Sequence, residues 1–189
     1  SRPPTPARRD RARRLDDGAL SPMRAKPVIL VFAAFLAVFA GALWWFQTRA
    51  YYEVLEGDGH VIVQGQQLPV QAFEGIDAPT SPLKLRACFR LADGAAPDAL
   101  AIFPAAEDAT PLVAPGWFDC FDARALSAAL ADGPARAVLA EANAPYGFDR
   151  IVALSPEGRG WMWRQINRCG EAVFAGDPLP EGCPPRPGD

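Results

Sequence analysis

The longest apolar run in the sequence predicts a membrane-spanning helix near the N-terminal end. Nineteen residues, from Val28 to Phe46, pass without a charge, an amide or a hydroxyl group. At about 1.5 Å of rise per residue, a helix of this length approaches the ~30 Å hydrocarbon thickness of a bilayer. Backbone N–H and C=O groups in lipid must find partners within the segment, and a helix provides them. We therefore predict a transmembrane helix over residues 27–48, in contact with the lipid bilayer.

Two further features of this segment concern its packing and its processing. Ala33, Ala37 and Gly41 recur four apart, which lets a second membrane helix approach closely, although an alanine-rich composition also produces this spacing by chance. Ala40-Gly41-Ala42 would suit a signal peptidase, but the apolar run continues beyond it. An aromatic belt typical of the outer membrane interface follows: Trp44, Trp45, Tyr51 and Tyr52, with Arg49 among them. We expect the segment to remain uncleaved as an anchor.

Beyond the anchor, apolar residues recur mainly at the two-residue period of β-strands. Residues 83–91 alternate most clearly and predict a half-buried strand. A Pro-Glu-Gly-Arg turn separates residues 148–155 from residues 160–168 and predicts a β-hairpin. Shorter apolar runs predict three more strands, over residues 60–63, 68–73 and 99–103. The first two should form a hairpin. The second contains Pro69, which lacks a backbone N–H, so we expect it at a sheet edge.

The clearest helix signal lies at residues 123–132. Asp122 precedes them as a good N-cap, because its carboxylate can accept hydrogen bonds from the first-turn N–H groups. Phe121 and Leu126 occupy the two positions of a hydrophobic staple, and a Gly-Pro pair ends the segment. Residues 135–142 fit either a second short helix or a strand, and intrinsic propensity favours the helix.

These elements predict an α+β fold, with one N-terminal transmembrane helix followed by a small antiparallel-sheet domain that has one or two short helices and is stabilised by disulfides. We expect a disordered basic segment over residues 1–26, the anchor over 27–48 and the globular domain over 55–185. The run MRAKP directly precedes the anchor, which is typical of a natural N-terminus, so we expect translation to begin at Met23. Alternatively, residues 1–22 form a basic arm that binds anionic lipid.

The charge distribution predicts how the anchor is oriented. Residues 1–49 carry nine Lys or Arg against three Asp, a net charge of +6, whereas residues 50–189 carry ten against nineteen Asp or Glu, a net charge of −9. Cytoplasmic flanks of membrane helices are enriched in Lys and Arg. We therefore predict a single-pass protein of the inner (plasma) membrane with a cytoplasmic N-terminus and a periplasmic C-terminal domain. An acidic exported domain is not expected to bind nucleic acid or, over its surface as a whole, anionic lipid headgroups.

All four cysteines lie beyond the anchor, in the compartment predicted to be oxidising. Their even number indicates disulfides, and of the three pairings we favour Cys88–Cys120 with Cys169–Cys183. The alternative is a metal site, but no two cysteines have Cys-x-x-Cys spacing and the single histidine, His60, is far away in sequence. We therefore expect structural disulfides and no metal or other cofactor.

The sequence contains no recognisable catalytic motif. The Gly-x-Ser-x-Gly, P-loop, Gly-x-Gly-x-x-Gly and His-Glu-x-x-His patterns are all absent. His60 has no Ser or Cys near it in a recognisable arrangement, so we interpret it as an exposed turn residue and not as a base. Carboxylates are abundant, but spacing along the chain alone cannot place two of them at the separation that glycoside hydrolysis needs.

The most site-like cluster lies on the last predicted hairpin, where Arg and Trp alternate with amide side chains. This combination is typical of protein interfaces. It is equally typical of an ordinary sheet, with aromatic side chains in the core and each Arg paired with an acid on the other face. Both interpretations stay open here. The residues of this candidate interaction surface are Arg150, Arg159, Trp161, Trp163, Arg164, Gln165 and Asn167.

The C-terminal half carries a resemblance to a known group of proteins. Its motifs are RACF at residues 86–89, WFDCFD at 117–122 and YGFDRIVALSPEGRGWMWRQINRCGE at 146–171. Together with the N-terminal anchor, they resemble a family of uncharacterised short single-pass membrane proteins from alphaproteobacteria. The resemblance covers most of residues 80–170. It implies an exported, disulfide-bearing domain and supplies no activity.

We therefore expect a non-enzymatic accessory, assembly or scaffold protein, anchored in the membrane, that binds another membrane or periplasmic protein. The first alternative is a periplasmic ligand-sensing domain whose signalling partner is a separate chain, and the second is a carboxylate-dependent hydrolase. A binding module should expose a Trp/Arg patch, and a sensor should have a pocket lined by aromatic side chains. An enzyme should bring ionisable side chains together in a cleft.

Overall fold

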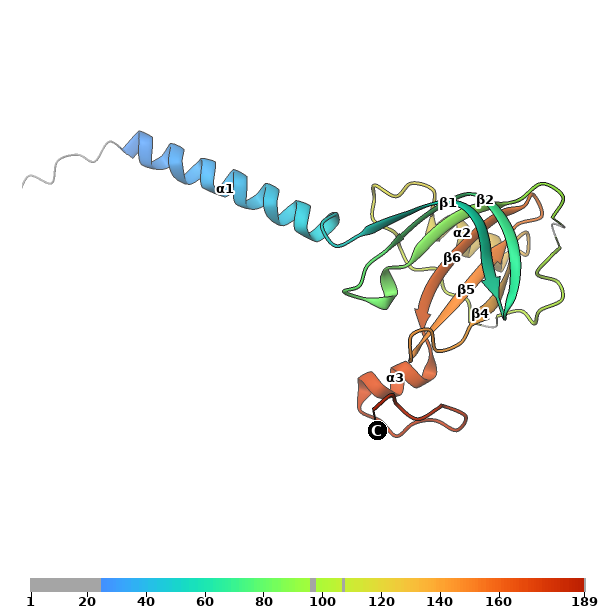
Figure 1. Ribbon diagram of the computed structural model, residues 1–189. Coiled ribbons are helices and arrows are strands. Elements are labelled where there is room, and N and C mark those ends of the chain that lie inside the picture. Colours follow the sequence, from blue (N-terminus) through green and yellow to red (C-terminus); the bar gives the residue numbers. More distant parts are fainter. Residues whose placement is uncertain (1–24, 96–97, 107, 189) are drawn as a thin grey trace, which may run out of the picture. The chain divides into compact units, whose positions relative to one another are not determined.

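The computed structural model describes residues 25–95, 98–106 and 108–188 and divides the chain into two compact units between Phe46 and Gln47 (Figure 1). The expectations for residues 1–22 and for Met23 concern positions outside these ranges.

Helix α1 (Ala25–Thr48) forms the described part of the first unit, and its last two residues belong to the second. The helix is long and apolar enough to cross a membrane, a property that it shares with signal sequences. Its large apolar side chains are exposed. Ala33, Ala37 and Gly41 all lie on α1, where a spacing of four places them on one face. The helix itself is confirmed, whereas its insertion in a membrane and its packing against a second membrane helix stay predictions.

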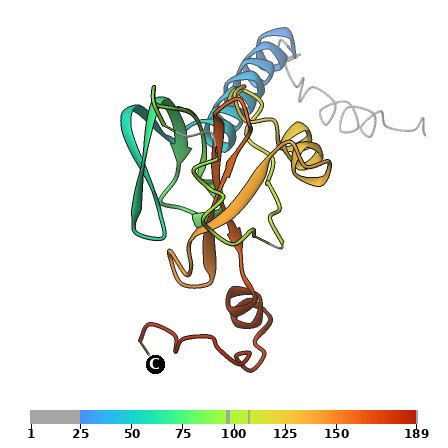
Figure 2. The same cartoon turned by 90° about the vertical axis from the view of Figure 1, so that its right-hand side faces the viewer.

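The second unit is built on one six-stranded antiparallel sheet in the order β1-β2-β3-β6-β5-β4. The sheet curls until its two outermost strands approach each other, and the N–H of Gln64 then donates to the C=O of Ala140 at 2.8 Å (Figures 1 and 2). The result is a partly closed barrel with an inner and an outer face. Its strands are β1 (Glu53–Val63), β2 (Gln66–Asp77), β3 (Arg86–Leu91), β4 (Arg136–Glu141), β5 (Phe148–Leu154) and β6 (Arg159–Ile166).

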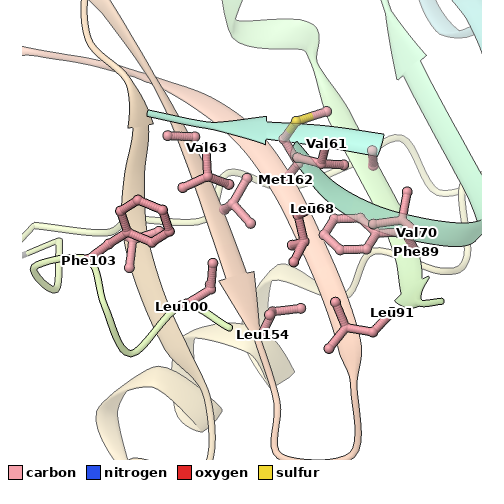
Figure 3. Close-up of a cluster of buried hydrophobic side chains, with 14 of the residues drawn as sticks. Val61, Val63, Leu68, Val70, Phe89, Leu91, Leu100, Phe103, Leu154 and Met162 are labelled. Carbon is pink, nitrogen blue, oxygen red and sulfur yellow. The ribbon is translucent and has the colours of Figure 1, made fainter. Parts of the chain in front are cut away.

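The inner face of the curled sheet holds the larger hydrophobic cluster (Figure 3). Ala87 of β3 and Val152 of β5 both pair with Met162 of β6, so all three side chains lie on this face. The two-residue alternation sends Leu85 and Phe89 to the same side. The alternation predicted for residues 83–91 is therefore confirmed from Leu85 onward, after a short 3-10 turn over Pro82–Lys84.

The outer face of the sheet is buried over its central strands as well. Trp163 has no exposed surface and meets the ring of Phe121 edge-on, with the centroids 6.3 Å apart. Leu126 of helix α2 (Ala123–Ala131) belongs to the same cluster. The disulfide between Cys88 and Cys120 ties β3 to the segment that precedes α2. The central strands are therefore covered on both faces.

Helix α2 begins at the predicted residue and ends at Ala131, one residue before the predicted end. The Asp122 carboxylate accepts a hydrogen bond from the N–H of Ala125 at 3.0 Å. Phe121 and Leu126, the two staple positions, are both buried. Gly133 follows the helix with a φ of 88°, in the left-handed region that glycine adopts without steric cost.

Replacing Asp122 by alanine is expected to lower the free energy of unfolding by about 1 kcal/mol, because a first-turn N–H loses its acceptor. Asp132, at the opposite end of α2, is exposed and offers a matched control, since its removal leaves the N-cap intact. Urea denaturation followed by circular dichroism compares the two variants. Equal losses in Asp122→Ala and Asp132→Ala would contradict the capping role.

A third helix, α3 (Arg168–Ala175), follows β6 directly and was not predicted. Asn167 caps it, with its side-chain oxygen accepting from the N–H of Gly170 at 3.0 Å. Cys169 in its first turn forms a disulfide with Cys183. Both favoured cysteine pairings are thus confirmed, and the second attaches the C-terminal tail to α3.

Two sequence expectations for the middle of the chain are wrong. Residues 99–103 form turns and not a strand, although Leu100 and Phe103 are buried in the inner cluster. Residues 136–141 form strand β4 and not the favoured helix. Pairing with β5 and the complete burial of Val138 outweigh a small difference in propensity.

The expectation that Pro69 marks an edge strand is also wrong, because β2 lies between β1 and β3. The pairing of β2 with β3 begins at Val70, one residue after Pro69. Pro69 contributes its C=O, which accepts from the N–H of Ala92 at 3.0 Å. The missing N–H therefore falls at the end of the ladder with β3, where proline is tolerated.

Candidate functional site

The residues of the candidate interaction surface do not lie on one surface. They alternate along β5 and β6, so sequence neighbours face opposite sides of the sheet. Trp161 and Trp163 are 8% and 0% exposed, in the cluster on the outer face. The guanidinium of Arg159 lies over the Trp161 ring, 5.2 Å from its centroid. The hairpin therefore fits the second interpretation, with aromatic side chains in the core.

Arg150 and Arg164 lie opposite each other on β5 and β6 and occupy the inner face. Nη1 of Arg164 donates to both carboxylate oxygens of Asp77 on β2, at 3.1 and 2.9 Å. Arg150 forms an ion pair with Glu141 on β4. The two guanidinium groups therefore bind acids on opposite sides, which relieves the repulsion between like charges on neighbouring strands. They do not converge on a shared ligand site.

Gln165 and Asn167 line a large cavity, of about 750 Å³, beside the end of β6. Gln165 fixes one wall, since its Oε1 accepts from the N–H of Thr110 at 2.9 Å and its Nε2 donates to the C=O of Asp108 at 2.8 Å. The side chains of the described residues that line the cavity include no aromatic ring. Its polar and charged lining also includes Asn143, Asp149, Arg168 and Glu171.

The opposite wall is held by hydrogen bonds around the turn that joins β4 to β5. Oδ1 of Asp149 accepts from the N–H of Asn143 at 3.0 Å and from Nδ2 of Asn167 at 2.6 Å. Oδ1 of Asn143 accepts from the N–H of Gly147 at 3.0 Å. Gly147 in turn packs against Gly170 of α3, where a Cβ would lie 2.2 Å from the Gly147 carbonyl oxygen. These polar groups connect the turn, the hairpin and α3, so their first role is structural.

The described residues offer limited means for chemistry. No group of three His, Cys, Asp or Glu side chains among them could hold a metal ion. His60 is exposed on strand β1, not in a turn. The cavity can accept a small polar solute, and Asp149 already uses one carboxylate oxygen in the two bonds described above.

Arg86, the first residue of the RACF motif, is a buried cation held by backbone carbonyls. It is 4% exposed, and its Nε donates to the C=O of Leu112 at 2.7 Å. Its Nη1 donates to the backbone C=O of Leu83, at 2.7 Å, and to that of Leu85. Burial lowers the pKa of Arg86 to about 10, because desolvation disfavours the charged form, so the group remains charged near neutral pH. Arg86 thereby holds the loop before α2 against β3.

A group of aromatic and basic side chains surrounds the start of the second unit, and we call it the aromatic–basic cluster. Trp117, the first residue of WFDCFD, donates from its indole N–H to the C=O of Thr48 at 2.7 Å. The guanidinium of Arg49 lies 4.9 Å from the centroid of the Trp117 ring. The cluster comprises Arg49, Tyr51, Tyr52, Lys84, Trp117 and Phe118. The sequence placed three of these in an aromatic belt, but nothing in it paired them with residues 84, 117 and 118.

Strand β1 has an open edge. It pairs with β2 along its length, and beyond the Gln64 contact with β4 the described residues show no strand on its other side. Val54 and Leu55 are 58% and 37% exposed close to the start of the strand. Glu53 and Glu56 flank them and are exposed. This edge directly follows Tyr51 and Tyr52 of the aromatic–basic cluster in the chain.

A protein-family model matches residues 60–184, which is 125 of the 189 residues. The chain belongs to DUF6446, a family of unknown function. The DUF6446 region begins within β1, contains both disulfides and lies entirely beyond α1. Membership in DUF6446 agrees with the expected uncharacterised family, whereas the expected range of source organisms stays a prediction. Comparison with curated proteins gives no match, and comparison with solved structures gives none either.

Proposed function

We propose that this protein is a non-enzymatic accessory protein of the cell envelope, anchored in the inner membrane by α1, whose periplasmic domain binds another envelope protein. The change of net charge from +6 to −9 across the apolar segment supports a cytoplasmic N-terminus. Two disulfides in the second unit support an oxidising compartment for it. The observation that carries the binding function is the open edge of β1.

An open strand edge presents backbone N–H and C=O groups that a strand of another protein can pair with. Edges in soluble proteins are commonly short, charged or covered, because an exposed apolar edge promotes association. In β1, Val54 and Leu55 remain exposed between two glutamates. A partner strand with apolar side chains and flanking Lys or Arg would match this pattern. Binding would therefore add a seventh strand next to β1.

The experiment compares proteins captured from detergent-solubilised envelopes by the full chain and by two variants. Val54→Lys/Leu55→Lys places charges on the edge, which natural sheets use to prevent pairing. Ile102→Lys is the matched control, because Ile102 is 70% exposed and lies in the loop between β3 and α2, not on β1. At least one protein should be captured by the wild type and the control and lost with the edge variant. If no captured protein depends on the edge, the proposed binding mode is wrong.

The polar cavity supports ligand sensing as a second candidate function. At about 750 Å³ it falls within the size range of small-molecule sites, and its walls come from a loop, a hairpin and α3. A small polar ligand would raise the melting temperature of the full chain by mass action. Thermal shift of the wild type and of Gln165→Leu against a panel of periplasmic metabolites separates the candidates. A ligand that stabilises only the wild type favours sensing over strand addition.

A further inference from the structure

The residues that follow α1 belong to the folded domain and do not form a loose linker. Thr48 accepts the indole N–H of Trp117 at 2.7 Å, and Arg49 lies over the Trp117 ring. Tyr52 meets the same ring edge-on, with centroids 5.6 Å apart, and donates its N–H to the C=O of Arg49 at 3.1 Å. The end of the helix is thus bound to a residue 69 positions further along the chain.

Lys84 brings a second cation to the same place. Its Nζ lies 5.1 Å from the Tyr52 ring centroid and 5.8 Å from that of Tyr51, and it donates to the hydroxyl of Thr80 at 3.1 Å. Tyr51 is 50% exposed. Two cations and four aromatic rings therefore gather at the start of a domain that is otherwise acidic, with a net charge of −9 over residues 50–189.

The covalent chain places this cluster at the membrane surface if α1 crosses the bilayer. Thr48 lies two residues after Phe46, the last residue of the apolar run, which is about 3 Å along a helix. The headgroup region occupies roughly 5–8 Å on each side of the hydrocarbon core. Trp117 is hydrogen-bonded to Thr48, so its indole lies close to this region, and the orientation of the domain decides whether the ring faces the headgroups.

We propose that the aromatic–basic cluster is a lipid-binding face that seats the exported domain on the anionic phospholipid headgroups around α1. Trp and Tyr favour the headgroup level, where one side of the ring is apolar and the other is wet. Lys and Arg near an anionic surface are attracted to it. This inference rests on the membrane anchoring proposed above. It adds that the domain contacts the membrane directly, which would hold the nearby edge of β1 close to the bilayer.

The test uses the full chain in liposomes with phospholipids brominated near the headgroup end of their acyl chains, since bromine quenches only nearby tryptophan. Trp44→Phe/Trp45→Phe removes the two tryptophans of α1 and leaves three of five, of which Trp161 and Trp163 are buried in the domain. Quenching of Trp117 alone should then remove up to about one third of the emission. Adding Trp117→Phe should abolish that loss. Quenching that persists without Trp117, or no quenching in the first variant, would overturn the proposal and leave the cluster as an internal contact.

Two further comparisons keep the result interpretable. The wild type, with Trp44 and Trp45, reports whether α1 is inserted, and if its emission is not quenched the anchoring itself fails and this inference fails with it. Lys84→Gln should reduce Trp117 quenching in anionic liposomes but not in zwitterionic ones. Arg90→Gln, an exposed cation at the other end of β3, is its matched control and should change neither. Equal quenching in Lys84→Gln and wild type in anionic liposomes would overturn the role of charge.

Discussion

Replacing Arg86 by methionine is expected to lower the free energy of unfolding by about 3 kcal/mol, one of the two largest effects we expect in this protein. Methionine keeps much of the apolar stem but removes every donor, so the carbonyls of Leu83, Leu85 and Leu112 lose the bonds that they accept from Arg86. A buried acceptor left without a donor costs about 1–3 kcal/mol. Removal of a desolvated charge offsets part of this sum.

Arg90 provides the control for Arg86. It lies on the same strand and the same face, four residues further on, but it is exposed. Arg90→Met should change the stability by no more than about 0.5 kcal/mol, as is usual for surface substitutions. Urea denaturation in detergent, followed by circular dichroism, measures both variants. A loss below 1 kcal/mol for Arg86→Met would show that the loop before α2 does not depend on this residue.

Replacing Gly170 by alanine is expected to cost a comparable amount, about 3 kcal/mol, at the upper end of the range for overpacking. The added Cβ would lie 2.2 Å from the carbonyl oxygen and 2.9 Å from the carbonyl carbon of Gly147, and neither backbone atom can rotate away. Relief requires α3 to move off the turn between β4 and β5. Hydrogen exchange should therefore increase first in α3 and in residues 143–147.

Gly116→Ala is the matched control for this substitution, because no atom lies within 4 Å of the Cβ that it would add and its φ is not in the left-handed region. It should leave both the stability and the exchange pattern close to those of the wild type. The close contact of α3 with the turn is refuted if Gly170→Ala behaves in the same way. The Cys169–Cys183 disulfide is kept in both variants, so the tail stays attached throughout.

The elements that the sequence predicted well are those whose signals lie within a few residues. Helix α2 carries its own N-cap at Asp122 and its own glycine stop, and the hairpin of β5 and β6 contains its own turn. Strand β4 was misassigned because its alanine-rich sequence has helical propensity, and only pairing with β5 makes it extended. Helix α3 was missed because its docking depends on two glycines 23 positions apart.

In the candidate site, too, the sequence predicted local features and missed those that depend on distant contacts. The sequence assigned the side chains of β3 to the correct two faces, but the alternation does not say which face other parts of the chain will cover. Arg86 and Arg90 share one face of β3, yet only Arg86 is buried, because residues 112 and 113 fold across that end of the strand. Trp161 and Trp163 were assigned to a surface in one interpretation, and α2 with its preceding loop places them in the core.

By itself the sequence determined the apolar helix α1, the change of charge across it, the even number of cysteines beyond it and the antiparallel class of the domain. Each of these follows from composition or from short spacings, which tertiary contacts cannot alter. The tertiary structure alone decided which cations are buried, which strand edge stays open and how Trp117 meets the end of α1. These features depend on contacts between residues far apart in the chain, whose free energies exceed local propensity once they form together.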